Sequence, residues 1–320
     1  MSVTTTVTKT APTAAPYKLQ IVWRNVALMG YLHVAAVYGF YLMLTQAMWS
    51  TCITAVVLYF LSGLGITAGC HRLWSHKSYR ARLPLRVFLG VMQTMALQNS
   101  IFEWSRDHRV HHKFTETDAD PHNALRGFFF AHVGWLLCKK HPEVISKGSK
   151  VNMDDLLQDP VVTFQKKYYK PLAILACFVI PTLIPMVFFG ETFLNSFFVC
   201  ALWRYCFTLN MTWLVNSAAH MWGQKPYDTH INPAENWVVS IGAQGEGWHN
   251  YHHTFPYDYK TSEVPYTLNV TTMFIDAMRL IGQAYDCRVV PPETVKARMM
   301  RTGALADLHH HYDYEEEKDY

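Results

Sequence analysis

The sequence predicts an all-α integral membrane protein in which four transmembrane helices form two hairpins under a helical cytosolic cap. Of the 320 residues 50% are hydrophobic and only 16% are charged, whereas soluble domains carry about 25% charged residues. Such a composition is typical of a protein whose surface faces lipid. We expect one membrane domain at residues 21–303, because no linker rich in Gly, Ser or Pro divides it. A disordered cytosolic arm is expected at residues 1–20 and a disordered tail at residues 304–320.

The predicted membrane helices are the apolar segments long enough to cross a bilayer, which takes about 20 residues. They are residues 26–49, 51–70, 171–189 and 192–215. Very short turns join the first to the second span and the third to the fourth. A fifth apolar stretch, residues 83–102, is interrupted by one arginine and three amide side chains. We therefore expect it to be a helix lying at the membrane interface.

The distribution of Lys and Arg predicts how the chain is oriented in the membrane. Three of these residues precede the first span, sixteen lie in residues 71–170 and eight follow the fourth span. The two short turns carry none, and the one remaining residue, Arg204, falls inside the fourth span. By the positive-inside rule, both termini and the long middle segment are expected in the cytosol. The parts of the chain outside the bilayer then form a cap on one face.

Histidines are clustered in three short motifs. The motifs are HRLWSH with His71 and His76, HRVHH with His108, His111 and His112, and HNYHH with His249, His252 and His253. Positions i, i+3 and i+4 share one face of a helix, so each HxxHH motif predicts three imidazoles aimed at one point. The HxxxxH spacing does not share a face of a straight helix. It predicts a helix end where the second span leaves the membrane.

This constellation predicts a centre with two metal ions on the cytosolic side. Neutral imidazole is the commonest ligand of transition metals. Eight ligands are too many for one ion, since a structural zinc takes four. No HExxH motif is present, which disfavours a zinc protease. Residue type alone leaves iron, copper, nickel and zinc open.

The motifs HRLWSH, EWSRDHRVHH, NSAAHMWG and GEGWHNYHHTFP, in this order and spacing, resemble the animal stearoyl-CoA/acyl-CoA desaturases, and the insect members most closely. This resemblance covers about residues 20–303. It identifies the chain as a member of a family of membrane enzymes in which nine histidines hold two iron ions. The ninth histidine would be His220, and Asn216 would reach the metal through a water molecule.

The resemblance also implies which residues meet the substrate. Those lining a kinked acyl tunnel and holding the thioester carbonyl would be Gln98, Asn99, Trp104, Thr212 and Trp213. Those contacting CoA would be Asn25, Arg106 and Asp107 at the pantetheine and Lys139 and Lys140 at the adenosine phosphates. Tyr59 and Gly63 lie one turn apart on the second span, on the face that would close the far end of the tunnel. We expect Gly63 to leave space there, where a larger residue would form a floor.

The activity implied by the resemblance is an O2-dependent oxidoreductase that inserts a double bond into a saturated long-chain acyl-CoA while O2 is reduced to water. A di-iron centre with O2 can oxidise an unactivated methylene. No flavin, nicotinamide or haem-binding segment is visible, so we expect electrons from separate proteins, cytochrome b5 and its NADH-dependent reductase. The expected location is the endoplasmic reticulum membrane, with lipid as a partner and no nucleic acid.

Several finer properties stay open at this stage. They are the double-bond position (Δ9 or Δ11), its geometry (cis or trans), the acyl chain length, the oligomeric state, and a role in general lipid metabolism or in insect pheromone synthesis. A histidine-rich di-iron hydroxylase or acetylenase shares the histidine motifs and differs in its product, an alcohol or alkyne. A di-haem protein or metal transporter would need ligands or polar residues within the spans. Only His33 is such a histidine, and we expect it to be a hydrogen-bonded structural residue.

Overall fold

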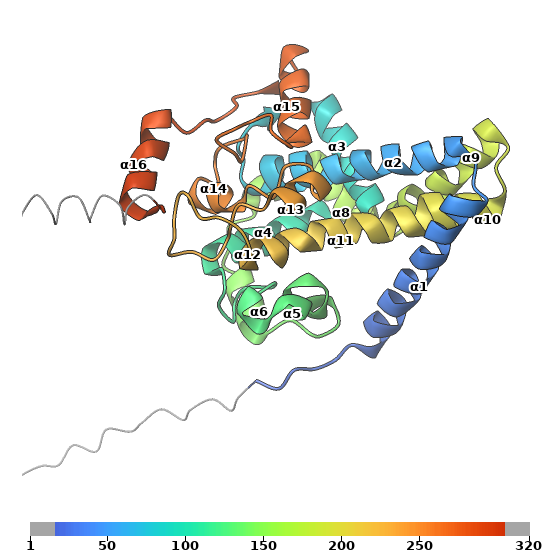
Figure 1. Cartoon of the computed structure of the whole chain (residues 1–320), viewed down its shortest axis with the longest axis horizontal. Helices are drawn as coiled ribbons and strands as arrows, with labels where there is room; N and C mark the ends of the chain where they lie inside the picture. The colour runs from blue at the N-terminus through green and yellow to red at the C-terminus, as the bar shows by residue number, and fades with distance from the viewer. Residues whose placement is uncertain (1–16, 305–320) are drawn as a thin grey trace, which may run out of the picture.

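The computed structural model describes residues 17–304, so most of the two predicted disordered ends lies outside the described residues. Helices long and apolar enough to cross a membrane are present where the sequence predicts them. They are Trp23–Thr45, Trp49–Ser75, Pro160–Phe189 and Phe193–Met221. Both hairpin turns lie at one end of the bundle, and the cap lies at the other end (Figure 1). The chain is therefore a multi-pass membrane protein, as predicted.

The four spans are built from several helical elements. The first is α1 (Trp23–Thr45), and the second is α2 (Trp49–Leu64) followed by the π-helical η1 (Gly65–Ser75). The third comprises α8 (Pro160–Ile174), the π-helical η4 (Leu175–Val179) and α9 (Ile180–Phe189). The fourth comprises α10 (Phe193–Ser196), the π-helical η5 (Phe197–Trp203), α11 (Arg204–Asn216) and α12 (Ala218–Met221). The second and fourth spans extend past their predicted ends and into the cap.

Arg204 has a structural role inside the fourth span. Its side chain is fully buried and donates hydrogen bonds to the carbonyls of Cys177 (2.8 Å), Cys200 (3.0 Å) and Met95 (3.2 Å). Cys177 and Cys200 belong to the π-helical segments η4 and η5. Unsatisfied carbonyls are costly where no water reaches them. Arg204 therefore stabilises the places where two spans depart from regular α-helix.

The cap consists of short helices and one small sheet. Before the third span lie β1 (Arg80–Ala81), α3 (Leu83–Ala96), α4 (Ile101–Phe114), η2 (Ala124–Arg126), α5 (Phe128–His132), η3 (Gly134–Leu136), α6 (Pro142–Gly148) and α7 (Asp154–Leu157). After the fourth lie α13 (Trp237–Gly242), α14 (His249–Thr254), α15 (Val270–Leu280), β2 (Ala284–Tyr285) and α16 (Pro292–Thr302). The strands β1 and β2 pair antiparallel, with Arg80 opposite Tyr285. The two halves of the cap are therefore joined to each other.

The sequence suggested one helix over residues 83–102, but the structure divides this apolar stretch into two helices. Helix α3 ends at Ala96, and Leu97 takes the left-handed conformation with φ 48° and ψ 51°. Helix α4 begins at Ile101, where Ser100 and Glu103 form a reciprocal capping box. Such a box satisfies two of the amide groups that a helix start leaves free. The break separates an apolar helix from the helix that carries the HRVHH motif.

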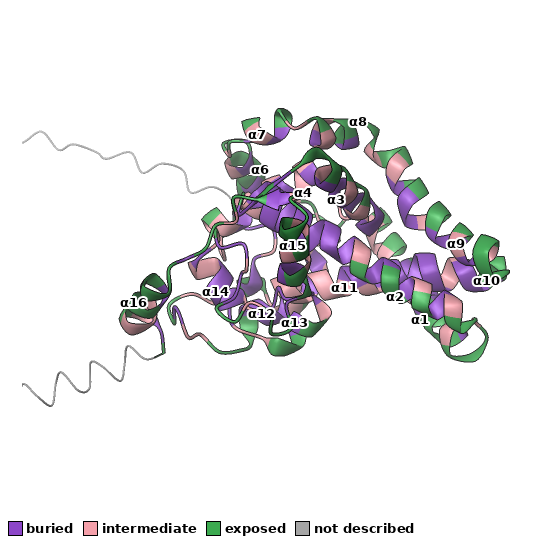
Figure 2. Ribbon diagram, turned by 90° about the horizontal axis from the view of Figure 1, so that it is seen from above, coloured by how far each residue is buried: buried purple, intermediate pink, exposed green. Residues whose placement is uncertain are grey.

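The buried share of residues differs between the spans (Figure 2). In the most apolar part of the first span 28% of residues are buried, against 67% in the second span. Large apolar side chains such as Val34 and Phe188 are more than 70% exposed, as expected for surfaces that face lipid. The predicted structural role of His33 agrees with its contacts, since Nδ1 lies 2.8 Å from the Met29 carbonyl and Nε2 lies 3.3 Å from the Asn210 amide.

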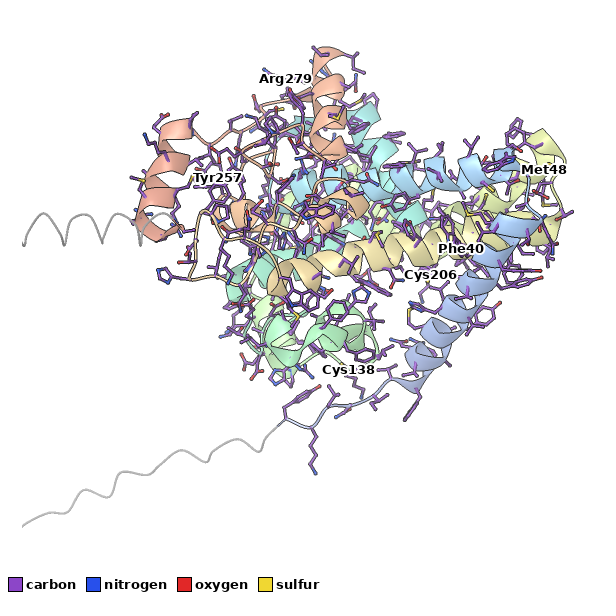
Figure 3. All side chains as sticks on the ribbon, viewed as in Figure 1. Phe40, Met48, Cys138, Cys206, Tyr257 and Arg279 are labelled. Atoms are coloured by element: carbon purple, nitrogen blue, oxygen red, sulfur yellow. The ribbon has the colours of Figure 1, made fainter. Side chains whose placement is uncertain are left out.

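The chain just before α1 is held against the cap. The amide of Val22 donates to the carbonyl of Leu137, and the amide of Lys139 donates to the carbonyl of Gln20, both at 2.8 Å. Cys138 lies between these contacts and beside the entry to α1 (Figure 3). Met48, in the first hairpin turn, is at the opposite end of the molecule from Tyr257 of the cap (Figure 3). The entry to α1 and the basic residues at 139 and 140 are therefore neighbours.

Candidate metal centre and the adjoining cavities

The HxxxxH motif is explained by the π-helix η1. In an α-helix, residues five apart point about 140° away from each other. In a π-helix the hydrogen bond runs from residue i+5 to residue i, and the amide of His76 donates to the carbonyl of His71 at 3.1 Å. The imidazole rings of His71 and His76 lie 4.9 Å apart. The second span therefore does not end at His71 but continues with a wider turn that brings both histidines to one side.

The two HxxHH motifs are helical, but neither aims its three imidazoles at one point. His108 and His112 of α4 belong to one group of potential ligand atoms, whereas His111 belongs to another. In α14 the arrangement is reversed, because His252 belongs to the first group while His249 and His253 belong to the second. Each motif thus contributes to both groups.

The nine histidines predicted as ligands converge in these two groups. The first holds His71, His76, His108, His112 and His252, and the second holds His111, His220, His249 and His253. Within each group the potential ligand atoms lie within 4.8 Å of one another. The helices that supply them come from both the spans and the cap, since His71 is in η1 and His220 in α12 of the spans. The two HxxHH motifs are carried by α4 and α14 of the cap.

The spacing of the imidazoles fits metal ions with more than four ligands. Neighbouring Nε2 atoms lie 2.8 Å apart for His76 and His108, 2.9 Å for His71 and His252, and 3.0 Å for His220 and His249. With a metal–nitrogen bond of about 2.1 Å, ligands at right angles are about 3.0 Å apart and tetrahedral ligands about 3.4 Å. The Nε2 atom of His111 is buried without a hydrogen-bond partner in the described chain. The residues present therefore fit a pair of metal ions.

Carboxylates orient the rings from behind. Nδ1 of His71 lies 2.8 Å from Glu246, Nδ1 of His111 lies 2.8 Å from Asp120, and Nδ1 of His220 lies 3.4 Å from Glu116. A carboxylate at this nitrogen fixes the tautomer so that the other nitrogen faces the metal. Burial raises the pKa of Glu246, but Arg72 and His71 outweigh this effect and hold the pKa below its ordinary value. Glu246 is thus a carboxylate anion at neutral pH.

Five imidazoles of the centre are held in the neutral form at physiological pH. Burial lowers the pKa of His108, His112 and His252 well below the ordinary value, and neighbouring histidines lower it further. The same causes act on His249 and His253. Neutral imidazole is the form that binds a metal ion.

Sequence reasoning missed these carboxylates. Glu246 stands three residues before His249, the Glu-x-x-His spacing found in soluble di-iron bundles, and this was the available signal. The structure uses that glutamate differently, since its contacts are to Arg72 and to Nδ1 of His71. No comparable spacing marks Asp120 and Glu116, which the fold brings to His111 and His220.

Two cavities meet at the metal centre. The outer cavity measures about 600 Å³ and runs from Arg24 and Lys170 inward. The inner one is narrow, about 50 Å³, and ends near Tyr59 and Gly63. The residues that line both are Trp104, His108, Thr212 and Asn216. Because they share these residues, the two cavities adjoin beside the histidines and form one passage.

The junction of the two cavities, which we call the bend, is held by hydrogen bonds between predicted tunnel residues. The amide nitrogen of Gln98 donates to the hydroxyl of Thr212 at 2.9 Å, and the Trp104 indole donates to the Gln98 amide oxygen at 3.3 Å. Trp104 also stacks on His108, with ring centroids 4.9 Å apart. Asn99 and Trp213 line the outer cavity alone. The structure thus brings all five predicted tunnel residues to the walls of one passage.

The residues predicted to contact CoA lie at the outer mouth, and several are paired with each other. Asp107 lines the outer cavity and contacts both Arg106 and Lys140. Lys139 is exposed beside them. The Asn25 amide donates to the carbonyl of Leu136 at 2.8 Å. Arg106, Asp107 and Lys140 thus form one cluster, and Asp107 is the residue of the predicted set that lines the cavity.

The inner end of the passage differs from the expectation that Gly63 leaves open space. A Cβ atom at Gly63 would lie 1.9 Å from the amide nitrogen of Gln244. This side chain is buried and donates to the carbonyl of Phe60 at 3.3 Å. Tyr59 donates to the carbonyl of Gly242. The floor is therefore closed by the loop after α13 packing against the second span.

Comparison with known proteins now decides the family. Residues 47–267 match the model of the family described as fatty acid desaturase. The chain belongs to the fatty acid desaturase family. Over 289 residues it is 61% identical to the acyl-CoA Delta-9 desaturase of Acheta domesticus, covering 90% of this chain and 80% of that protein. It is 58% identical to the acyl-CoA Delta12-desaturase of the same species, with 90% and 81% covered.

A mammalian relative gives the same result. The chain is 57% identical to the stearoyl-CoA desaturase of Homo sapiens, with 89% of this chain and 79% of that protein covered. The predicted membership of the acyl-CoA desaturase family, insect members included, is therefore confirmed, and the protein is an enzyme of this family. Relatives named for Δ9 and for Δ12 bonds are similar to this desaturase to nearly the same degree, so similarity does not separate the bond positions.

Proposed function

We propose that this desaturase is an O2-dependent acyl-CoA desaturase that introduces one double bond, at Δ9 or Δ11, into a saturated long-chain acyl-CoA. One observation carries the proposal. The two groups of imidazoles lie beside the bend at which the outer and inner cavities meet, where Trp104 and Thr212 line both. An acyl chain that enters by the outer mouth passes this bend, with its methylenes next to the metal centre.

Two iron ions are proposed as the cofactor, held by the nine histidines. Bound iron with O2 supplies the oxidant that an unactivated methylene requires. The chain's own residues have other tasks. Trp104, Gln98 and Thr212 fix the bend and so select which methylenes face the metals. The buried position of the centre excludes bulk water and so limits side reactions of the oxidant.

The overall reaction requires electrons from outside the chain. The substrate loses two hydrogen atoms, and O2 takes up these and two further electrons and protons to give two water molecules. Cytochrome b5 and its NADH-dependent reductase are the proposed source of these electrons. The endoplasmic reticulum is the proposed membrane, with both termini in the cytosol. This orientation is supported by the Lys and Arg distribution, since the turns at the end opposite the cap carry none.

The proposal is tested by expression in yeast that lacks its own desaturase. We expect growth without added unsaturated fatty acids and new monounsaturated acids, with the bond position and geometry read by mass spectrometry and gas chromatography. The matched control is His108→Ala, which should yield none. Alcohols or alkynes in place of alkenes would favour the hydroxylase or acetylenase instead. Absence of any new lipid from a protein with full iron content would contradict the proposal.

A further inference from the structure

The turn between α3 and α4 has an unfavourable backbone conformation, which contacts with the rest of the fold must stabilise. Leu97 and Asn99 both have positive φ, at 48° and 68°, a conformation that costs free energy for leucine and less for asparagine. Such strain persists only where the surroundings fix the conformation. Leu97, Gln98 and Asn99 all line the outer cavity. The strained turn is therefore part of the wall of the passage.

Two buried amides lie behind this turn and hold it from outside the cavity. Gln93 in α3 is 0% exposed and Gln165 in α8 is 4% exposed, and neither lines the passage. The Gln93 amide nitrogen donates to the carbonyl of Asn99 at 2.7 Å. The Gln165 oxygen accepts the amide of Ile101 at 3.1 Å, which is the first residue of α4.

The same two amides are bonded to each other. The Gln165 nitrogen donates to the Gln93 oxygen at 2.7 Å and to the Thr94 hydroxyl at 3.1 Å. Every polar atom of both side chains therefore has a partner, as buried polar groups require. Through these bonds the third span fixes both sides of the turn, its Asn99 carbonyl and its Ile101 amide.

We propose that Gln165 is a positioning residue that sets where the acyl chain bends, and hence the double-bond position, although it does not touch the substrate. This inference rests on the proposed desaturase function. Few contacts separate Gln165 from the passage. The turn that Gln165 holds includes Gln98, whose side chain is hydrogen-bonded to Thr212 and Trp104. Trp104 stacks on the ligand His108. A shift of the turn moves the bend relative to the metals, which changes the methylene that is presented.

The test compares three variants in the yeast strain described above. Gln165→Leu removes the amide and leaves the side-chain oxygen of Gln93 without its donor, while the Gln93 nitrogen can still donate to Asn99. In Gln93→Leu/Gln165→Leu both members of the pair become apolar, which restores much of the lost stability but not the bonds to Asn99 and Ile101. Gln158→Leu changes an exposed glutamine just before α8 and serves as the control. Iron content of each purified protein is measured as a readout independent of turnover.

We expect both Gln165 variants to keep their iron and to form a second positional isomer. The ratio of this isomer to the main product should rise about tenfold, the change that one lost hydrogen bond of ordinary strength can cause. The KM for acyl-CoA should stay within about twofold, since the outer mouth is unchanged. Gln158→Leu should give the wild-type ratio. Where Gln165→Leu does not accumulate, the double variant carries the test.

The possible failures can be told apart. Wild-type protein that loads iron but makes no alkene would overturn the proposed function and this inference with it. The inference alone would be overturned by a different result. In that case the wild-type protein makes one main isomer, and the double variant makes the same isomers in the same ratio, whatever its rate. Loss of iron with an unchanged ratio would show that the two glutamines only stabilise the fold.

Discussion

The carboxylate of Glu246 joins a buried arginine to a histidine of the metal centre. Oε2 lies 2.8 Å from Nδ1 of His71, and Oε1 accepts hydrogen bonds from Nε and Nη2 of Arg72 at 3.1 and 2.9 Å. Arg72 is fully buried and also donates to the carbonyl of Tyr259 at 2.8 Å. Glu246 therefore orients a ligand from the second span, and Arg72 connects this carboxylate to the loop that follows the last histidine motif.

Replacement of this carboxylate should weaken iron binding, and it also removes the ion-pair partner of the buried Arg72. We expect Glu246→Gln to lower iron affinity about 10–100-fold, the usual effect of removing a group that orients a ligand. Iron retained against a chelator is the measurement, and thermal unfolding of the metal-free protein separates iron loss from misfolding. Glu293→Gln, at an exposed position of α16, is the control. Wild-type retention of iron in Glu246→Gln would show that this contact does not orient His71.

His220 provides the sharpest test of the ligand set, because it lies outside the three histidine motifs. We expect His220→Ala to abolish desaturation while the protein still inserts into membranes, since the second group holds only four imidazoles. Asn216→Ala should be milder, about 10–100-fold, as a contact through water would be. His230→Ala, at an exposed position, should be neutral. Full activity of His220→Ala would remove it from the centre.

Acidification should destabilise the metal-free protein. Burial, then neighbouring charge, lowers the pKa of His76, His108, His112, His249, His252 and His253 well below 6.5. Below about pH 6.5 the unfolded chain therefore binds more protons than the folded one, and stability falls as pH falls. Above that pH the contribution is fully present. Each such histidine contributes up to about 1.4 kcal/mol per pH unit.

This pH effect is measured as the unfolding temperature of iron-free protein in detergent between pH 7.5 and 5.0. We expect a steady fall below about pH 6.5. His253→Gln removes one titrating group and should make the fall less steep, whereas His230→Ala should not. Iron-loaded protein should show a smaller fall until protons displace the metal. A flat profile for the iron-free protein would contradict the buried neutral histidines.

How much the sequence predicts depends on whether the determining contacts are local. The spans, the hairpins and the helical HxxHH motifs follow from hydropathy and from helical period, and they are present as predicted. The family was predicted from motif order alone. The division of each motif between two metal groups was not, because the relative rotation of α4 and α14 depends on packing. The π-helix at His71 was also missed, although the HxxxxH spacing is its signature.

The parts of the site that sequence reasoning missed are the long-range ones. Asp120, Glu116 and Glu246 reach their histidines only in the folded chain. The space at Gly63 was predicted from the missing side chain of glycine, while the residue that fills it, Gln244, lies far along the chain. A local sequence pattern predicts which face of a helix lines the site, whereas tertiary packing decides which residues contact that face.

Charge at the outer mouth should control substrate binding. We expect the Lys139→Ala/Lys140→Ala variant to raise the KM for acyl-CoA more than it lowers kcat, with a smaller effect at high salt. The ion pair between Lys140 and Asp107 is a further reason for the higher KM. Removal of Lys140 leaves the Asp107 carboxylate without this partner near the CoA phosphates. Lys296→Ala in α16 is the control at an exposed position. An unchanged KM at low ionic strength would contradict the phosphate contact.

The floor of the inner cavity should set the acyl chain length. A Cβ at Gly63 would collide with the far end of the Gln244 side chain, so Gly63→Leu must push that amide away from the carbonyl of Phe60 or into the cavity. Either movement shortens the space beside Tyr59. We expect products from mixed 14-, 16- and 18-carbon acyl-CoAs to shift toward the shorter chains. The double-bond position should not move, because Trp104 and Thr212 hold the bend at the other end of the inner cavity.

The matched control for this variant is Gly30→Leu. A Cβ at Gly30 in α1 meets nothing within 4 Å, so it adds the same side chain to a span without touching the passage. If Gly63 served only to let the loop pack against the second span, Gly63→Leu would lower turnover of all chain lengths alike. Shortening Gln244 by Gln244→Ala in the Gly63→Leu background should then restore turnover without any shift in the products. An unaltered product ratio in Gly63→Leu, with and without Gln244→Ala, would show that Gly63 does not control chain length. A shift in Gly63→Leu that Gln244→Ala reverses would identify Gly63 and Gln244 as the floor.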